Sequence, residues 1–187
     1  MIILLVGTSI SCSESEAIID QVLDNVDTET GGIIRTIQNP PTNIQVNNPD
    51  NDLIEFIIEV QQGNGSAYPD FKEVRLYLSL FIDGALSMPI LDANGAPTEE
   101  LLISSYQPDG FTIGSNGLPR TTISYTGLEL LAFFPEGIQL NTPITWASFR
   151  LELEMNNGNV YSVESAGGAI SGPYFNAPFS YRVGLRL

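Results

Sequence analysis

Apolar and polar residues alternate along several stretches of this chain, with the period of two that a half-buried β-strand produces. The longest alternation runs from residue 74 to residue 82, and five apolar side chains share its core face: Val74, Leu76, Leu78, Leu80 and Ile82. Residues 149–155 and 179–185 repeat the pattern, the latter with Phe179, Tyr181, Val183 and Leu185 on one face. Each segment predicts a strand with one face in a hydrophobic core.

Shorter apolar runs, separated by turn residues, extend this pattern over most of the chain after Gly31. Further strands are predicted at residues 33–37, 53–60, 101–104 and 121–125. An Asn-Gly step at residues 157–158 separates the alternating run 149–155 from residues 160–163. This arrangement predicts a hairpin, because both turn residues tolerate positive φ. A second Asn-Gly step, at residues 94–95, predicts another turn.

Two segments carry helical signals. Thr126 and Glu129 have the spacing of a capping box ahead of Leu130 and Leu131, which predicts one or two helical turns that bridge two sheets. Residues 15–26 place their apolar side chains on one helical face and predict a short amphipathic helix. A mostly flexible acidic tether is the alternative for this second segment.

Seven or more short strands between Gly, Pro and Asn turns predict an all-β fold. The expected architecture is a single immunoglobulin-like β-sandwich with one short helical insert, spanning residues 31–187. The chain has a single cysteine, so the Cys…Trp…Cys pattern of antibody domains is missing. Without an intrachain disulfide, the fold must be held together by packing alone.

Cys12 follows an apolar run, residues 2–6, and a run of small residues, which together resemble a bacterial lipoprotein signal. In such proteins the signal is cut just before the cysteine, which then carries the lipid. We therefore expect residues 1–11 to be a signal peptide and residues 12–30 to be a lipid-bearing, acidic and partly helical tether. The alternative is a buried N-terminal strand in which Cys12 is a free core thiol. The apolar run is far shorter than the roughly 20 residues that a membrane-spanning helix needs.

The charge balance excludes two classes of partner. The chain has 22 acidic and 7 basic residues, with a net charge of −15, and the basic residues are scattered. Nucleic acids and anionic lipid surfaces are both bound through clustered Lys and Arg, so we expect neither. The chain has no histidine, which excludes Ser-His-Asp and Cys-His catalysis and His-ligated zinc. Carboxylate pairs and oxygen-ligated metals are the chemistries that are left.

Two groups of acidic residues are candidates for that chemistry. Asp50 and Asp52 lie in a segment rich in oxygen donors, but the glycine and distal glutamate of an EF-hand loop are missing. They are weak calcium ligands, and an ordinary turn is the expectation. Glu152 and Glu154 share a strand face with Glu164 nearby, as a glycosidase pair would require, but a solvated sheet face explains them more simply. We expect no catalytic residue, no metal, and no cofactor besides a lipid on Cys12.

Aromatic residues in Gly-, Pro- and Ser-rich segments are the candidates for binding. Exposed aromatic side chains stack on sugars or anchor protein interfaces. Most aromatics of this chain are expected to pack in the core or at strand ends. Because loops carry function more often than strands do, we predict Tyr106, Phe111 and Tyr174 as the exposed binding residues.

Four segments carry Gly and Pro at turns and aromatics on strands: Gly31–Thr36, Phe71–Ser79, Gly117–Ser124 and Ser171–Tyr181. Together they resemble small lipoproteins of Bacteroidota, which are often encoded beside SusC/SusD-like outer-membrane pairs. The resemblance covers most of residues 31–183. Residues 13–16, Ser-Glu-Ser-Glu, resemble the acidic export signal that sends lipoproteins of this phylum to the cell surface. The resemblance implies a lipid anchor in the outer membrane and names no catalytic residue.

These observations lead us to expect a non-catalytic cell-surface lipoprotein. It would act as an interaction or scaffold subunit of an outer-membrane complex that contains a SusC/SusD-like pair or another outer-membrane β-barrel protein. One alternative is a glycan- or peptide-binding accessory module for nutrient uptake, which an exposed aromatic platform would favour. Another alternative is a subunit of a larger outer-membrane assembly or secretion machine. Trp146, the only tryptophan, would report ligand binding by fluorescence.

Overall fold

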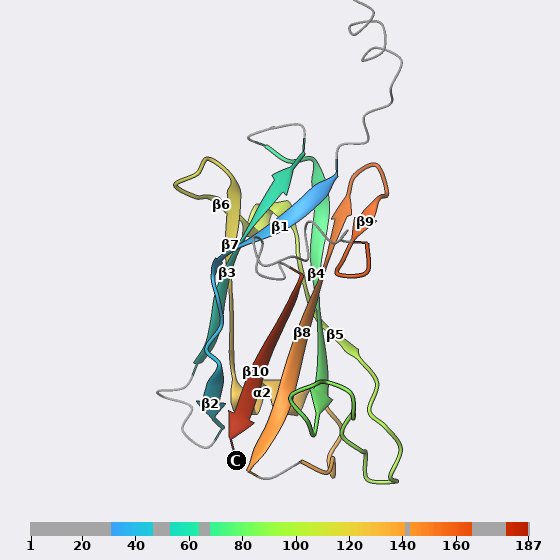
Figure 1. The fold of residues 1–187 in the computed structure, drawn as a ribbon. Coiled ribbons are helices and arrows are strands. Elements are labelled where there is room, and N and C mark those ends of the chain that lie inside the picture. The colour runs from blue at the N-terminus through green and yellow to red at the C-terminus, as the bar shows by residue number, and fades with distance from the viewer. Residues whose placement is uncertain (1–30, 47–52, 64–67, 141–142, 166–178, 187) are drawn as a thin grey trace, which may run out of the picture.

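The computed structural model describes residues 31–46, 53–63, 68–140, 143–165 and 179–186, which form two β-sheets and short helical segments (Figure 1). The strands in chain order are β1 (Gly32–Gln38), β2 (Asn43–Gln45), β3 (Leu53–Gln62), β4 (Phe71–Phe81), β5 (Leu101–Tyr106), β6 (Thr112–Ile113), β7 (Pro119–Thr126), β8 (Ile144–Met155), β9 (Val160–Tyr161) and β10 (Ser180–Arg186). The α-helix is α2 (Gly127–Ala132), and η1 (Pro108–Gly110) is a 3-10 turn.

The strands divide into a four-stranded and a six-stranded sheet. The four-stranded sheet has the order β1-β3-β7-β6, and all its neighbours are antiparallel. The six-stranded sheet has the order β2-β10-β8-β4-β5, with β9 paired to the end of β8. Its one parallel pair is β2 with β10. The chain changes sheets between β1 and β2, where Pro40 and Pro41 cannot donate to a strand ladder.

One hydrophobic core fills the space between the two sheets. On β8, alternate residues from Thr145 to Met155 are buried, as the period of two requires. Phe56 of β3 reaches across to the six-stranded sheet, where its ring centre lies 5.7 Å from that of Phe149 and 4.8 Å from that of Tyr181. The two sheets therefore pack as a β-sandwich, and each fully buried Phe or Leu contributes roughly 1.5–3 kcal/mol.

The strands predicted from alternation are confirmed, with one correction at Ile82. Val74, Leu76, Leu78 and Leu80 are buried on the core face of β4, and Phe179, Tyr181, Val183 and Leu185 are buried along β10. Ile82 lies one residue past the end of β4 and is 37% exposed, because the chain turns away at Asp83. The predicted strands at residues 33–37, 53–60, 101–104 and 121–125 correspond to β1, β3, β5 and β7.

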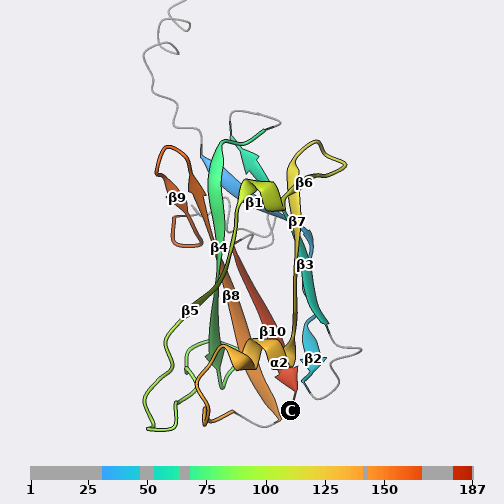
Figure 2. The ribbon, with the colours of Figure 1, turned by 180° about the vertical axis from the view of Figure 1, so that it is seen from behind.

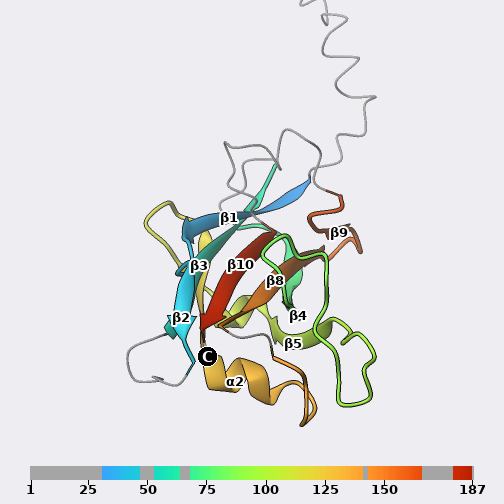
Figure 3. The ribbon, with the colours of Figure 1, turned by 60° about the horizontal axis from the view of Figure 1, so that its bottom comes forward.

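The predicted hairpin turn at residues 157–158 and the helix predicted after Thr126 are also confirmed. Gly158 has a φ of 87° in the turn between β8 and β9, and its amide donates to the carbonyl of Met155 at 3.0 Å. Thr126 caps α2: its hydroxyl accepts the amide of Glu129 at 3.2 Å, and the Glu129 carboxylate accepts the amide of Thr126 at 2.7 Å. Helix α2 connects β7 to β8 and so passes from one sheet to the other (Figure 3). Nowhere in the described ranges is a helix long and apolar enough to span a membrane.

The two ends of the sandwich carry different elements. Strand β1 begins at one end, which we call the N-terminal end, with β6, β9 and η1 nearby (Figures 1 and 2). Helix α2 and residues 82–100 lie toward the opposite end, which we call the far end. In the sequence, the segment that carries Cys12 precedes β1.

Candidate functional site

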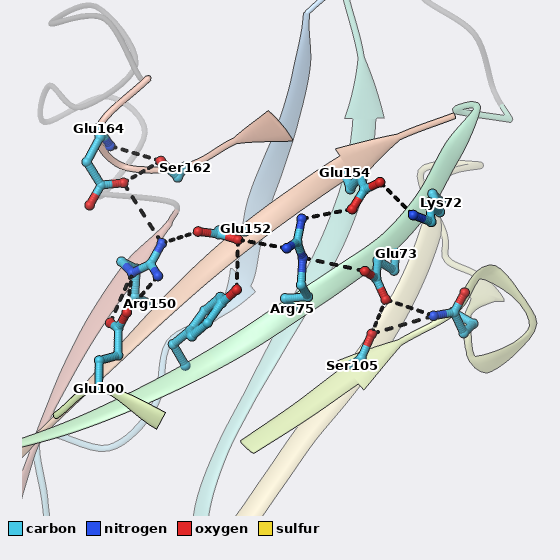
Figure 4. A network of polar contacts seen from close by, with 12 residues as sticks. Lys72, Glu73, Arg75, Glu100, Ser105, Arg150, Glu152, Glu154, Ser162 and Glu164 are labelled. Carbon is cyan, nitrogen blue, oxygen red and sulfur yellow. Dashed lines mark hydrogen bonds and ion pairs between the residues drawn. The ribbon is translucent and has the colours of Figure 1, made fainter. Parts of the chain in front are cut away.

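The outward face of β4 and β8 carries a network of charged side chains (Figure 4). Alternate residues of a strand share a face, so the strands that bury apolar residues on one side present these charges on the other. The eight charged members are Lys72, Glu73, Arg75, Glu100, Arg150, Glu152, Glu154 and Glu164. We call this set the paired-charge network.

Arg75 lies at the centre of the paired-charge network. Its Nη2 atom lies 2.8 Å from Oε2 of Glu154, and its Nη1 atom lies 3.4 Å from Oε2 of Glu152. Its Nε atom lies 3.5 Å from Oε1 of Glu73. Lys72 donates to the other oxygen of Glu154 at 2.7 Å. The Arg75 guanidinium thus lies between the two carboxylates that share the outward face of β8 and pairs with both.

Arg150 holds the other side of Glu152. Its Nη1 atom lies 2.6 Å from Oε1 of Glu152, and its Nη2 atom lies 2.6 Å from Oε2 of Glu100. Its guanidinium carbon lies 4.2 Å from the ring centre of Tyr77, whose hydroxyl donates to Glu152 at 3.0 Å. The hydrogen bond to Glu100, together with that to Glu152, raises the pKa of Arg150. Every oxygen of Glu152 is therefore engaged by an arginine or a tyrosine.

Three carboxylates of this network, Glu73, Glu152 and Glu164, have lowered pKa values. The Ser105 hydroxyl donates to Glu73 and lowers the pKa of that carboxyl, and Ser162 does the same for Glu164. Partial burial opposes ionisation of Glu152, but the hydrogen bonds from Arg150 and Tyr77 outweigh it and lower the Glu152 pKa. A glycosidase acid needs a raised pKa. Glu152 therefore has the environment of an ionised structural carboxylate.

A fully buried carboxylate, Glu59, lies on the outward side of the four-stranded sheet. It is 0% exposed, and the strand register places Arg35 of β1 and Arg120 of β7 directly opposite it. Arg120 donates to Oε1 of Glu59 from Nε at 3.0 Å and from Nη2 at 2.7 Å. Asn116 donates to Oε2 at 3.0 Å, and Nη1 of Arg35 lies 3.7 Å from the same oxygen. We call these four residues the Glu59 cluster.

The connection between β6 and β7 covers Glu59 from the solvent side. Gly114 passes so close that a Cβ atom there would lie 2.7 Å from both Nε of Arg120 and Oε1 of Glu59. Strands β1 and β7 each supply one arginine of the cluster. The Glu59 cluster therefore ties β1, β3 and β7 together across one sheet, which is a structural role.

Near the start of β8, the outward face of the six-stranded sheet carries a pocket in place of the paired charges. A pocket of about 300 Å³ opens between the β1–β2 connection and strands β8 and β10. Besides Tyr181, which is buried in the core, its lining combines an indole, a proline ring, an arginine and three small polar side chains: Trp146, Pro40, Arg182, Asn39, Thr42 and Ser180. We call it the Trp146 pocket.

Two glycines shape the surroundings of Trp146. Gly84 lies so close that a Cβ atom there would approach the indole to 3.2 Å, and its carbonyl accepts a hydrogen bond from Arg182. The guanidinium carbon of Arg182 lies 5.6 Å from the indole ring centre. Gly184 is opposite Trp146 in the β8–β10 register, and a Cβ there would collide with the side chain of Asn43. Trp146 is therefore packed against its neighbours and still forms one wall of an open pocket.

Arg182 differs from most basic residues of this protein. Five of the seven basic side chains pair with a carboxylate: Arg35, Lys72, Arg75, Arg120 and Arg150. Within the described part of the chain, no carboxylate pairs with Arg182, which instead bonds the Gly84 carbonyl and lies over the indole. The Trp146 pocket therefore presents a positive charge in a protein whose net charge is −15.

A turn at residues 82–88 separates the Trp146 pocket from a larger apolar hollow. Gly84 contacts Trp146 on one side of the turn, while Ile82 and Met88 line the hollow on the other. The hollow has a volume of about 570 Å³, and its apolar lining is Ile82, Met88, Pro89, Leu91, Pro97 and Leu140. The Asp83 carboxylate accepts the amides of Met88 and Ser87, which fixes the turn, and the bond from Met88 lowers the Asp83 pKa. We call this hollow the far-end groove.

Two of the predicted binding residues lie in the described structure, and neither is in an open loop patch. Tyr106 is the last residue of β5, and its hydroxyl lies 3.5 Å from that of Tyr125. Burial raises the Tyr106 pKa. Phe111 follows η1 and packs edge-on against Phe71, with the ring centres 5.0 Å apart. Both side chains pack against the core, because bulky aromatics at the sandwich edge cover apolar surface.

The other predicted site residues lie outside the described residues. These are Cys12, the candidate lipidation site; Asp50 and Asp52, the weak calcium candidates; and Tyr174, the third aromatic. The expected helix at residues 15–26 also lies outside them. Within the described ranges, no group of three or more His, Cys, Asp or Glu side chains is arranged to hold a metal ion.

Sequence reasoning missed the Glu59 cluster and the Trp146 pocket. In the sequence, Glu59 is a single polar residue in an apolar strand, and its partner Arg120 is 61 residues away. Trp146 is the only tryptophan and occupies an outward position of an alternating strand, a signal that could have identified it. Its neighbours at residues 39–42, 84 and 182 come from separate segments, so their convergence required the fold.

Comparison with known proteins adds no family assignment. No protein-family model matches the chain, and no curated protein matches it significantly.

Proposed function

We propose that this protein is a non-catalytic cell-surface lipoprotein, anchored through Cys12, that acts as an interaction subunit of an outer-membrane complex with a SusC/SusD-like pair. The sandwich would be a rigid body that carries contact surfaces, and binding energy would be concentrated in a few aromatic, apolar and arginine side chains. The lipoprotein signal and the resemblance to Bacteroidota lipoproteins supply the cellular setting.

The strand order supports an immunoglobulin-like assignment of the sandwich. With strands lettered in the usual way, β1-β3-β7-β6 corresponds to A-B-E-D, and β10-β8-β4 corresponds to G-F-C. Helix α2 replaces the simple loop between the E and F strands. Folds of this kind serve many functions, so the functional argument depends on the surfaces.

The state of the carboxylates supports a non-catalytic role. The chain has no histidine. The pair that shares a strand face, Glu152 and Glu154, is held by Arg75 and Arg150, and the pKa of Glu152 is lowered. An acid catalyst of a glycosidase would need the opposite shift.

The single observation that carries the proposal is the placement of the far-end groove and the Trp146 pocket. The groove is lined mainly by residues 82–97, and the pocket includes Trp146 near the start of β8; these segments lie toward the end of the sandwich opposite the start of β1, which follows the Cys12 segment in the sequence (Figure 1). A lipid anchor at Cys12 would therefore leave both surfaces accessible. Three exposed apolar side chains in the groove, Ile82 (37%), Met88 (50%) and Leu91 (36%), suit burial against an outer-membrane partner protein.

The proposal is tested by isolating the native protein from outer membranes in mild detergent and identifying its partners by mass spectrometry. A stoichiometric SusC/SusD-like pair is the expected result. Recovery only as a free, lipid-modified monomer would overturn the interaction-subunit role. Cys12→Ser should release the protein from the membrane fraction, and retention there would overturn the lipid anchor.

Two matched variants test the far-end groove itself. Met88→Glu places a charge in the groove and should abolish co-purification of the pair, because a buried unpaired charge is strongly unfavourable. Ile113→Glu is the control, since Ile113 is 55% exposed on β6 near the N-terminal end. Equal loss of the partner in both variants would argue against the groove as the contact surface.

A second function, a glycan-binding accessory module for nutrient uptake, is favoured by the Trp146 pocket. An indole wall beside small polar side chains suits a sugar, because sugar rings stack on aromatic faces while their hydroxyls need hydrogen-bond partners. Saturable binding of an oligosaccharide, detected through the fluorescence of Trp146, would establish this role.

A further inference from the structure

The Trp146 pocket combines three kinds of recognition group. Trp146 and Pro40 supply apolar surfaces, and Asn39, Thr42 and Ser180 supply small hydrogen-bonding side chains. The volume of about 300 Å³ is at the lower limit for small-molecule sites in proteins. The pocket therefore suits one or two sugar rings better than a large ligand.

Arg182 adds a positive charge to this pocket. The pairing of arginine with carboxylate is the rule on the outer surface of this protein, as Arg75, Arg120 and Arg150 show. No carboxylate of the described residues pairs with Arg182, although the chain carries a large acidic excess. A guanidinium binds a carboxylate through strong, charge-assisted hydrogen bonds, so a ligand that carries one would complete the same pairing.

The position of the indole and the guanidinium favours a compact ring over an extended peptide. Strand β10, which contributes Ser180 and Arg182, is paired with β8 from Ser180 to Arg186. On its other side it is paired with β2 only from Gly184 to Arg186, so no described strand pairs with residues 180–183 there. A peptide added at that edge would bind mainly through backbone hydrogen bonds. Trp146 and Arg182 lie at outward positions of β8 and β10, so a ring on the sheet face contacts both.

We infer that the Trp146 pocket binds an acidic sugar, a pyranose ring that carries a carboxylate, with Trp146 against the ring and Arg182 on the carboxylate. This inference deepens the second function proposed above and rests on it. Asn39, Thr42 and Ser180 then bind the ring hydroxyls. A neutral sugar would use the same stacking surface and leave Arg182 without its carboxylate.

The test uses the purified protein and tetrasaccharides of galacturonic, glucuronic and mannuronic acid, each paired with its methyl-esterified form. The ester keeps the ring and removes the charge, so the pair isolates the contribution of the carboxylate. Binding is measured by the fluorescence of Trp146, the only tryptophan, and by titration calorimetry. At least one acidic tetrasaccharide should bind saturably, about tenfold or more tightly than its ester.

Two arginine variants locate the interaction. Arg182→Gln should weaken binding of the acidic sugar by about tenfold or more and leave binding of the ester unchanged. Arg186→Gln removes the same charge from the same strand outside the pocket, and its affinity should match the wild type. Trp146→Phe, followed by calorimetry, should weaken acid and ester alike. Circular dichroism and thermal unfolding check that each variant is folded.

The possible failures are distinguishable. Equal binding of acid and ester would overturn the acidic-sugar assignment and leave the glycan-binding function standing. Absence of binding to every acid and ester would overturn both. An equal loss of affinity in Arg182→Gln and Arg186→Gln would overturn the assignment of Arg182, because it would reduce the effect to overall charge.

Discussion

The Glu59 cluster and the Trp146 pocket both place an arginine on the outward face of a sheet, with opposite results. Arg120 donates two hydrogen bonds to a carboxylate that is 0% exposed. Arg182 is exposed beside an open pocket and bonds a backbone carbonyl and an indole. In the first region the protein itself supplies the anion, and in the second none of the described residues does. The comparison indicates that an outward arginine in this protein can serve either to hold strands together or, in the Trp146 pocket, to face an open site.

The largest effect is expected when the Glu59 cluster loses Arg120. Arg120→Met should destabilise the protein by about 3 kcal/mol, because it leaves a buried carboxylate with only Asn116 and the more distant Arg35. Urea denaturation at neutral pH measures the change. Arg186→Met is the control, and it should change stability by less than about 0.5 kcal/mol because Arg186 is exposed. Similar changes in stability for the two variants would show that Arg120 has no special structural role in the Glu59 cluster.

A smaller loss of stability is expected when the β6–β7 connection over Glu59 is displaced and no charge is removed. Gly114→Ala puts a methyl group 2.7 Å from both Nε of Arg120 and Oε1 of Glu59, so the loop must shift. The expected cost is about 1–3 kcal/mol, as for other overpacked sites. Gly110→Ala is the matched control, because a Cβ there meets nothing within 4 Å. A neutral result at Gly114 in thermal unfolding would mean that the cover yields without strain.

Loss of an arginine from the paired-charge network should cost less stability than its loss from the Glu59 cluster and more than its loss from the Trp146 pocket. Arg150→Met removes two short ion pairs, to Glu100 and Glu152, in a partly exposed setting and should cost about 1 kcal/mol at pH 7. Burial then acts on Glu152 without the hydrogen bond that opposes it, so the Glu152 pKa should rise. Carboxyl NMR titration of the two proteins measures that pKa directly.

The sign of the pH dependence follows from the lowered pKa of Glu152 in the folded protein. Its stabilising contribution is fully present above the unfolded value of about 4.3 and is lost as the pH falls through the folded value. The stability difference between wild type and Arg150→Met should therefore shrink in urea titrations as the pH is lowered from 7 to 3. A difference that stays constant over this range would show that Arg150 acts through packing on Tyr77 and not through charge.

The sequence predicted the parts of the fold that depend on local chemistry. The alternation along β8, the Asn-Gly turn before β9 and the capping box of α2 each follow from residues within a few positions of one another. Tyr106 was placed in a loop because serines and a proline surround it, but pairing with Val74 of β4 extends β5 to include it. Tertiary pairing therefore overrode the local composition.

The candidate sites depend on residues that are distant in the sequence. Glu59 and Arg120 become partners only when β3 pairs with β7. Trp146 and Arg182 approach each other only when β8 pairs with β10, and Gly84 reaches them from the turn after β4. No local pattern encodes these registers. The sequence therefore shows which residue types are present but not which of them come together in one site.

The smallest effect on stability is expected in the Trp146 pocket itself. Arg182→Gln should change the free energy of unfolding by less than about 0.5 kcal/mol, because no carboxylate of the described chain loses a partner and the guanidinium is exposed. Urea denaturation of this variant and of Arg120→Met measures the smallest and the largest expected change in the free energy of unfolding by the same method. A loss near that of Arg120→Met would mean that the contact with Gly84 and Trp146 is structural, and Arg182 would then cease to be a binding residue. A stable variant that has lost affinity for acidic sugar would separate the two uses of arginine, since function alone would then depend on Arg182.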